Sequence, residues 1–357
     1  MTRADNLYSP IQLGELKLNN RVLMAPLTRA RAEPGHLPGR LMAEHYAQRA
    51  EAGLIIAEAT MVSEGCCAFI AEPGIYSQEQ IAGWQQVTDA VHSKGGKIVL
   101  QLWHGGRACH PDLNSGRTPV APSEIAIDDL VYTRSGKQPY TIPRALKDDE
   151  IPAIVDSFRQ AAINAKTAGF DGVEIHGANG YLLDSFLRDG SNLREGPYGG
   201  SRENRGRLLF DVIKAVCAVW GSQRVGVRSS PLNSFNSMSD SDPIGLTRWL
   251  AEQLNGFDLA YWHLMRSDFL GQQTGDIITP ARKYYKGNLI CNMGYSAEEA
   301  NADILNGKVD AVAFGVPFIA NPDLVRRFQQ GAELNSADPK TFYTRGPTGY
   351  TDYPTLS

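Results

Sequence analysis

Eight short apolar segments recur along the chain, and longer amphipathic segments lie between them. Near-continuous apolar character in a short segment is typical of a strand that is buried on both faces. Strands that alternate with helices pair in parallel, and eight such units predict a closed (β/α)₈ TIM barrel rather than an open doubly wound sheet. The predicted strands are Arg21–Ala25, Leu54–Ala59, Lys97–Trp103, Gly172–His176, Arg224–Arg228, Leu259–Leu264, Leu289–Asn292 and Ala311–Gly315.

The length and composition fit one barrel domain over residues 1–357. The chain is 42% hydrophobic, which is enough to bury a large core. Single α/β barrels commonly exceed roughly 200–250 residues, so the length does not require a second domain. Two of the intervening helices are predicted from apolar residues spaced three and four apart, at Glu79–Lys94 and Ile151–Ala168. Asp148 or Asp149 is expected to cap the start of the second helix.

Two segments fall outside the strand–helix alternation. Met1–Asn20 precedes the first strand and is expected to form a hairpin over the bottom of the barrel. Residues 109–147 follow the third strand and form an insertion that is too long for an ordinary connection. An alternating piece at Leu130–Ile142 predicts a hairpin within this insertion, which we expect to cap the active face.

Charge, hydropathy and cysteine usage exclude several classes of partner. The formal net charge is -4, so no basic excess predicts a nucleic-acid partner. No apolar run approaches the ~20 residues of a membrane helix, and the first residues lack a signal-peptide pattern. Five scattered cysteines favour a reducing compartment, and we expect a cytoplasmic protein. Since no histidine or carboxylate cluster has metal-ligand spacing, no metal site is predicted.

Polar side chains gather at the predicted carboxyl ends of the strands, where barrel enzymes place their active sites. Each of these side chains, taken alone, has an ordinary structural explanation. Together at one rim they form a candidate site, because polar groups at the ends of buried strands need partners. The set comprises Thr28, Gln101, Trp103, His176, Asn179, Tyr181 and Arg228, and Pro26 lies beside Thr28 at the end of the first strand.

Glycine turns after the last two strands predict a phosphate site. Gly294 and Gly315 follow strands seven and eight, where barrels often bind a phosphate through backbone N–H groups and a helix N-terminus. Near this corner, Gln101 could both donate and accept at a pyrimidine edge, Arg228 could stabilise negative charge, and Thr28 could donate to a ring oxygen. This combination suits flavin mononucleotide (FMN).

Longer runs extend from near the first residue to the last few. They read NRVLMAPLTRAR, LIIAEAT, GIYSQEQIAGWQQVTDAVHSKGGKIVLQLWH, GFDGVEIHGANGYLLDSFLRDGSNLRE, YGGSRENRGR, SDSDP, FIANPDL and GYTDYPTL. In these runs the chain resembles the Old Yellow Enzyme family of FMN-dependent ene-reductases. The resemblance implies a flavin-binding (β/α)₈ barrel that uses NADPH or NADH as reductant.

The resemblance also implies a role for each matching position. Contacts to the isoalloxazine ring are implied for Pro26, Thr28, Ala59, Gln101 and Arg228. Contacts to the phosphate are implied for Gly294 and Gly315 with their neighbours Met293 and Val316. Tyr181 is implied as the proton donor, His176 and Asn179 as ligands of the substrate carbonyl oxygen, and Phe69, Trp103 and Tyr343 as residues that shape the substrate pocket.

The implied reaction is the reduction of the activated C=C bond of a small enone. NAD(P)H reduces FMN and leaves, and an α,β-unsaturated carbonyl compound then takes its place, which is a ping-pong scheme. Hydride passes from N5 to Cβ, and Tyr181 protonates Cα from the opposite face. Nitro compounds offer a similar oxygen to His176 and Asn179, so they are further expected substrates.

Three positions bear on how far the family pattern transfers. Val316 stands where the family usually has an arginine, so we expect weaker or more salt-sensitive FMN binding unless Arg345 reaches the phosphate. Met293 stands where a glycine is common. Asn179 is a position that the family fills with histidine or asparagine, and because an amide does not titrate, carbonyl binding should depend on pH mainly through His176.

Two other functions remain open at this point. A non-redox barrel enzyme, such as an aldolase or isomerase, would need a Schiff-base lysine or a carboxylate base at a strand end. Glu58 and Glu174 lie within strands, and Glu174 is expected to point away from the rim. An FMN-binding barrel of low turnover, acting as a store or sensor, is the other alternative. Both a monomer and a homodimer are compatible with the sequence.

Overall fold

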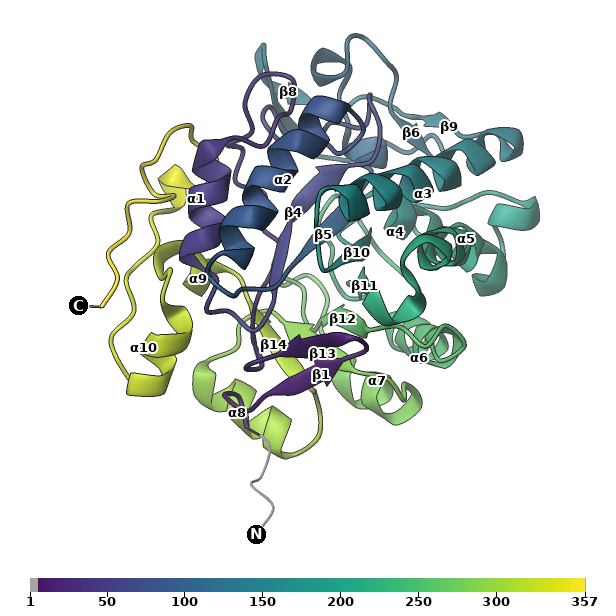
Figure 1. The fold of residues 1–357 in the computed structure, drawn as a ribbon. Coiled ribbons are helices and arrows are strands. Elements are labelled where there is room, and N and C mark those ends of the chain that lie inside the picture. The colour runs from purple at the N-terminus through teal and green to yellow at the C-terminus, as the bar shows by residue number, and fades with distance from the viewer. Residues whose placement is uncertain (1–5, 357) are drawn as a thin grey trace.

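Eight parallel strands close into a barrel in the computed structural model, which describes residues 6–356 (Figure 1). Each strand pairs with its neighbours in chain order, and the last pairs with the first. This arrangement confirms the predicted (β/α)₈ barrel. The barrel strands are β3 (Val22–Met24), β4 (Ile55–Met61), β5 (Ile98–Trp103), β10 (Gly172–Gly177), β11 (Val225–Ser229), β12 (Tyr261–Met265), β13 (Leu289–Asn292) and β14 (Ala311–Phe314).

Helices surround the barrel and cover its outer face (Figure 1). Trp84 of α2 and Phe158 of α3 are fully buried in the main core, beside outward-facing strand residues such as Leu100 and Val173. The helices are α1 (Arg40–Gln48), α2 (Gln78–His92), α3 (Ile151–Thr167), α4 (Leu182–Leu187), α5 (Arg202–Trp220), α6 (Pro243–Leu254), α7 (Ile278–Tyr284), α8 (Ala297–Leu305), α9 (Val316–Ala320) and α10 (Leu324–Gln330).

The prediction that Asp148 or Asp149 caps α3 is wrong. An additional 3₁₀ turn over Asp148–Glu150 precedes the helix, and Glu150 occupies the cap position without a side-chain capping bond. The carboxylate of Glu150 accepts from the backbone N–H of Lys147, and Asp148 pairs with Arg194. Because the turn extends the helix start by three residues, the aspartates lie too early in the chain to cap it.

The structure contains both hairpins that the sequence predicted. Strands β1 (Ile11–Leu13) and β2 (Leu16–Leu18) pair antiparallel, and their leucines pack against barrel-interior residues such as Ile56 and Val99. Strands β7 (Leu130–Thr133) and β8 (Gly136–Pro139) form the hairpin of the capping insertion. Two further short strands of this insertion, β6 (Val120–Ala121) and β9 (Arg144–Ala145), pair in parallel. The first five residues of the predicted amino-terminal hairpin segment lie outside the described residues.

Two general features follow from the structure. No helix among the described residues is both long and apolar enough to cross a membrane. All five cysteines are free, and four of them are buried.

Candidate active site

A cavity of about 600 Å³ opens at the carboxyl ends of the barrel strands. Apart from Trp103, it brings together every residue that the sequence singled out as a site residue. The remaining lining residues are mostly apolar, and the aromatic ones among them are Phe235, Phe269, Tyr295 and Phe314. The predicted residues that line it are Pro26, Thr28, Ala59, Phe69, Gln101, His176, Asn179, Tyr181, Arg228, Met293, Gly294, Gly315, Val316 and Tyr343.

Trp103 lies behind the cavity wall rather than in it. Its side chain is completely buried, and its ring meets Tyr181 edge to face at 5.0 Å and Phe69 at 6.5 Å between centroids. Trp103 can therefore shape the cavity only from behind these two side chains, and its role at the substrate pocket stays a prediction. As the last residue of β5, it supports the two aromatic side chains that do line the cavity.

His176 is held as a neutral hydrogen-bond donor. It lies near the end of β10 and is 4% exposed, and its Nδ1 accepts a hydrogen bond from the backbone N–H of Ala178 at 3.3 Å. In the neutral ring the proton must then be on Nε2. Burial, together with the positive charge of Arg228, lowers the pKa of His176 well below 6.5. The expected pH dependence of carbonyl binding through His176 is therefore confined to acidic pH.

Asn179 is also fixed as a donor. Its Oδ1 accepts a hydrogen bond from Asn233 Nδ2 at 2.8 Å, which directs the amide nitrogen away from that partner. Its backbone has φ +57°, the left-handed conformation that asparagine tolerates better than most residues. Its backbone N–H donates to Ser230 Oγ and its carbonyl accepts from Asn236 Nδ2, each at 2.8 Å.

The three residues that orient Asn179 were missed in the sequence. Ser230, Asn233 and Asn236 all follow β11, in the run SSPLNSFNSM. A serine- and asparagine-rich loop directly after a barrel strand is the signal that could have identified them, since such loops carry barrel active sites.

Tyr181 places its phenol at the same cavity. It precedes α4, is 7% exposed, and its ring meets the His176 ring edge to face at 5.1 Å between centroids. Burial raises the pKa of Tyr181 well above 10. The phenol is consequently protonated throughout the neutral and moderately alkaline range and can serve only as an acid there.

Glu174 corrects an expectation about the barrel interior. The sequence was interpreted as turning it away from the rim, but side chains two residues apart on a strand share a face, so Glu174 points into the barrel as His176 does. It is completely buried, and its carboxylate accepts from Gln101 Nε2 at 2.7 Å and from His263 Nδ1 at 2.9 Å.

The predicted phosphate corner is formed by two turns. Gly294 has φ +68°, and Met293 before it has φ +93°, a conformation that favours glycine and costs a side-chain-bearing residue energy. On the second turn, the Val316 side chain is 52% exposed. Arg345 lies beside residues 32–36 in a separate hollow, so it does not supply the missing cation.

Arg266 is the cation beside the first turn. Its Nε donates to the Met293 carbonyl at 2.8 Å, its guanidinium pairs with Glu299, and it covers the ring of Tyr295 at 3.6 Å. No sequence pattern singled it out, because it is brought to the turn from the end of the neighbouring strand β12.

The cavity has the features that FMN requires. A Cβ added at Gly294 would find its nearest heavy atom on Arg266 at 4.0 Å, and one added at Gly315 would find it on Leu27 at 3.4 Å, so both turns leave their backbone accessible. The Nε of Arg228 is buried and has no hydrogen-bond partner among the described residues. A buried guanidinium N–H at a cavity wall needs a hydrogen-bond acceptor, and a carbonyl oxygen at the edge of a flavin ring can be that acceptor. The residues present therefore fit the group.

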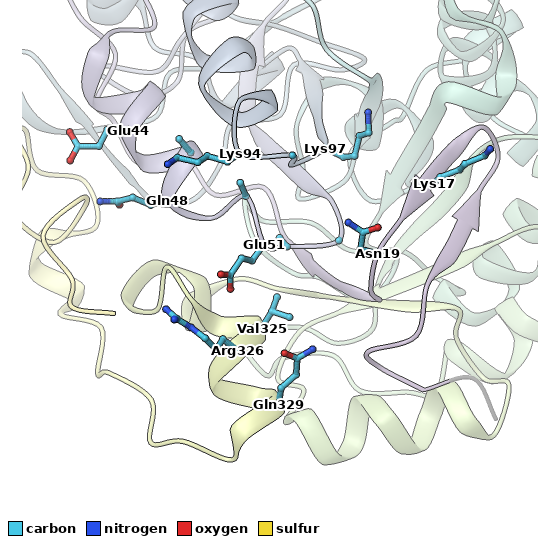
Figure 2. A pocket seen from close by; sticks show the side chains of 15 residues that line it. Lys17, Asn19, Glu44, Gln48, Glu51, Lys94, Lys97, Val325, Arg326 and Gln329 are labelled. Carbon is cyan, nitrogen blue, oxygen red and sulfur yellow. The ribbon is translucent and has the colours of Figure 1, made fainter. Parts of the chain in front are cut away.

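A second, larger hollow lies at the opposite end of the barrel, near the amino ends of β4 and β5 (Figure 2). Its volume is about 930 Å³. The side chains of Lys17, Glu44 and Glu51 are exposed there, and Lys97 is paired with Asp171. In barrels this end contributes to stability rather than catalysis, and the groove has the character of ordinary surface.

Glu72 anchors the loop that carries Phe69, and it makes stability depend on pH. Its side chain is completely buried, one oxygen accepts from the backbone N–H of Ala68 at 2.8 Å, and burial raises its pKa to about 8. Between the unfolded pKa of 4.5 and the folded value near 8, the folded state binds more protons, so Glu72 lowers stability progressively as pH rises.

We expect Glu72→Gln to remove this dependence. Relative to the unmodified protein, the variant should gain up to about 1.4 kcal/mol of unfolding free energy per pH unit between pH 5 and 8. Urea unfolding at both pH values measures the gain. Glu64→Gln, at an exposed position of the same loop, is the control and should produce no such trend. A constant difference between Glu72→Gln and the unmodified protein would contradict the expectation.

Comparisons with known proteins place the chain among flavoproteins. A family model described as the NADH:flavin oxidoreductase / NADH oxidase family matches residues 6–335. The chain is 48% identical over 356 residues to a probable flavin mononucleotide-dependent alkene reductase of Leishmania infantum, which covers 98% of this chain and 97% of that protein. It is 45% identical to 12-oxophytodienoate reductase 1 of Oryza sativa subsp. japonica, over 98% and 93% of the two chains.

Solved structures agree with these matches. Morphinone reductase superposes with a TM-score of 0.96 at 46% identity, covering 99% of this chain and 97% of that one. The old yellow enzyme from Trypanosoma cruzi superposes with a TM-score of 0.95 at 48% identity, covering 99% of both chains.

Proposed function

The chain belongs to the NADH:flavin oxidoreductase / NADH oxidase family and is an NAD(P)H-dependent FMN oxidoreductase of the Old Yellow Enzyme type, and from this premise we propose that it reduces the activated C=C bond of α,β-unsaturated carbonyl compounds. Relatives with similarity over nearly the whole chain include proteins described as an alkene reductase and an oxophytodienoate reductase. Nitroalkenes and nitrate esters are proposed as further substrates, because they offer a comparable oxygen.

The main support for this proposal is that His176 and Asn179 are hydrogen-bond donors with fixed orientations. His176 must donate from Nε2, because its Nδ1 is already an acceptor, and Asn179 must donate from Nδ2, because its Oδ1 is occupied. Two neutral donors directed at one cavity suit a single carbonyl oxygen. As negative charge develops on that oxygen during addition to the alkene, both hydrogen bonds strengthen, which lowers the barrier.

FMN, when bound, supplies the hydride chemistry between NAD(P)H and the alkene. On the protein side, Pro26, Thr28, Ala59, Gln101 and Arg228 would hold its ring. The backbone of Met293–Gly294 and Gly315–Val316 would hold its phosphate. Arg228, with its unpaired buried Nε, would stabilise negative charge at the ring edge.

Tyr181 would complete the reaction by giving its proton to Cα. Its phenol lies beside His176 at the same cavity, and its raised pKa keeps the proton on the oxygen at neutral pH. Delivery from the face opposite to the hydride would give net trans addition. Because reductant and alkene would use the same cavity in turn, the kinetics would be ping-pong.

The alternatives receive less support from the site. An aldolase or isomerase would need a free carboxylate or lysine at the cavity, but Glu174 is engaged by Gln101 and His263, and Glu58 by Tyr46 and Arg29. A flavin store of low turnover would not need two donors and an acid in fixed orientations.

Anaerobic titration of the purified protein tests the proposal. NADPH should bleach the flavin absorbance, and 2-cyclohexenone should restore it while its double bond is reduced. A flavin that NADPH bleaches but that cyclohexenone and nitroalkenes fail to reoxidise would disprove the alkene-reductase function.

The exposed Val316 leads to a prediction about the phosphate end. We expect Val316→Arg to tighten FMN binding by about 10-fold, because a charge-assisted hydrogen bond to phosphate is worth roughly 1.5–3 kcal/mol. Riboflavin, which lacks the phosphate, is the control ligand, and its affinity should not change. Dissociation constants from flavin fluorescence quenching, measured at low and high salt, give the comparison. Equal effects on FMN and riboflavin would contradict it.

A further inference from the structure

Glu174 links two side chains, Gln101 and His263, beneath the proposed flavin site. It is on β10 and fully buried, and its two carboxylate oxygens have different partners. One accepts from Gln101 Nε2 of β5 at 2.7 Å, and the other accepts from His263 Nδ1 of β12 at 2.9 Å. This glutamate takes no part in the reaction proposed above.

The bond to Glu174 decides how the Gln101 amide is presented. A carboxylate only accepts hydrogen bonds, so the amide nitrogen of Gln101 must face Glu174. If the amide were turned over, its oxygen would meet the carboxylate oxygen at the same short distance, which is repulsive. Gln101 therefore offers its oxygen and one remaining N–H to the cavity that it lines.

The charge of Glu174 also bears on Arg228. Burial opposes the ionisation of Glu174. The pKa of Glu174 is nevertheless lowered, by electrostatic attraction to His263 and Arg228 and by the hydrogen bonds from His263 and Gln101. The carboxylate is thus ionised, and it attracts a guanidinium that is only 6% exposed. In a buried setting, such a negative charge offsets part of the positive potential that Arg228 creates at the cavity.

We propose that Glu174 is a positioning residue for FMN. It fixes the Gln101 amide with its oxygen toward the flavin, and it offsets part of the positive potential of Arg228. In this way Glu174 helps set the reduction potential of the cofactor. This inference rests on the flavin chemistry proposed above. It assigns to Glu174 no contact with the substrate and no step in proton transfer.

Glu174→Gln in the holoenzyme is the direct test. An amide at this position can still accept from Gln101, but the negative charge is lost, so Arg228 should favour the reduced flavin more strongly. We expect reduced FMN to gain on the order of tenfold in binding relative to oxidised FMN, equivalent to a rise of about 30 mV in the two-electron midpoint potential. The visible flavin spectrum should shift as well.

Glu58→Gln is the matched control. Glu58 is also a fully buried glutamate on a barrel strand, but its partners are Tyr46 and Arg29, on the side of α1 and the carboxyl-terminal segment. This variant should alter stability without moving the midpoint potential. An unchanged potential in Glu174→Gln, or an equal change in Glu58→Gln, would overturn the proposal.

Glu174→Asp keeps the proposal testable if the glutamine variant does not fold. It retains the charge but withdraws the carboxylate from Gln101 by one methylene, so FMN should bind more weakly and its spectrum should change. Unaltered FMN affinity and spectrum in this variant would overturn the proposal too. Potentials measured with dithionite and a reference dye do not depend on NADPH or on any alkene, so failure of this inference is distinguishable from failure of the proposed function.

Discussion

Tyr181→Phe is expected to slow the reduction of 2-cyclohexenone by about 10²–10⁴-fold while leaving the reduction of the flavin by NADPH nearly unchanged. General acid catalysis by a positioned side chain contributes rate factors of this size. Phenylalanine keeps the ring contacts with Trp103 and His176, at 5.0 Å and 5.1 Å, so the cavity should keep its shape. Only the proton donor is removed.

Stopped-flow measurement of the two half-reactions separates these effects. Tyr140→Phe is the control, because Tyr140 is a partly buried phenol in the hollow next to the cavity and does not line the cavity itself. In the unmodified protein, the alkene half-reaction should also retain its donor up to pH 10, since burial raises the pKa of Tyr181 above that value. If both half-reactions slowed equally in Tyr181→Phe, the phenol would not be the acid.

The second large effect concerns binding of the carbonyl oxygen. Replacement of His176 or Asn179 by alanine is expected to weaken the binding of a phenolate, which mimics an enolate oxygen, by about 10- to 100-fold each. Hydrogen bonds to charged groups contribute roughly 1.5–3 kcal/mol, which corresponds to this range. The charge-transfer absorbance between the phenolate and the oxidised flavin gives the dissociation constant.

The chain offers a close control for this experiment. His104 follows β5, is 6% exposed, and accepts a hydrogen bond at Nδ1 from the backbone N–H of Gly106, two residues on, as His176 does from Ala178. It does not line the cavity. His104→Ala should therefore leave phenolate binding intact, and a loss equal to that in His176→Ala would show that the effect is structural.

Much of the fold could be predicted from local patterns in the sequence. Each barrel strand lies within about two residues of the predicted segment, because a strand buried on both faces must be almost wholly apolar. Strand β4 runs furthest past its predicted end, to Met61, and its register with β5 shifts between Ala57 and Thr60. The missed cap of α3 has a similar origin, since one added 3₁₀ turn displaces a boundary that composition alone does not mark.

The site could be predicted as a set of positions but not as a set of interactions. Because parallel strands bring their carboxyl ends to one rim, the residues at those ends had to converge, and all but Trp103 of the predicted site residues line the cavity. The sequence likewise placed Val316 where an arginine is usual. It did not indicate that Arg345 lies elsewhere, or that Arg266 covers the first turn from the neighbouring strand.

The sequence by itself therefore determined the barrel, its two hairpins and the identity of the polar groups at its mouth, since these follow from the periodicity and chemistry of residues close together in the chain. Only the tertiary structure decided what those groups can donate or accept. Asn179 is a donor because Asn233 occupies its oxygen, and Gln101 presents its oxygen because Glu174 holds its nitrogen. In both of these cases the partner is more than fifty residues away in the chain, and only the closed barrel brings the two side chains together.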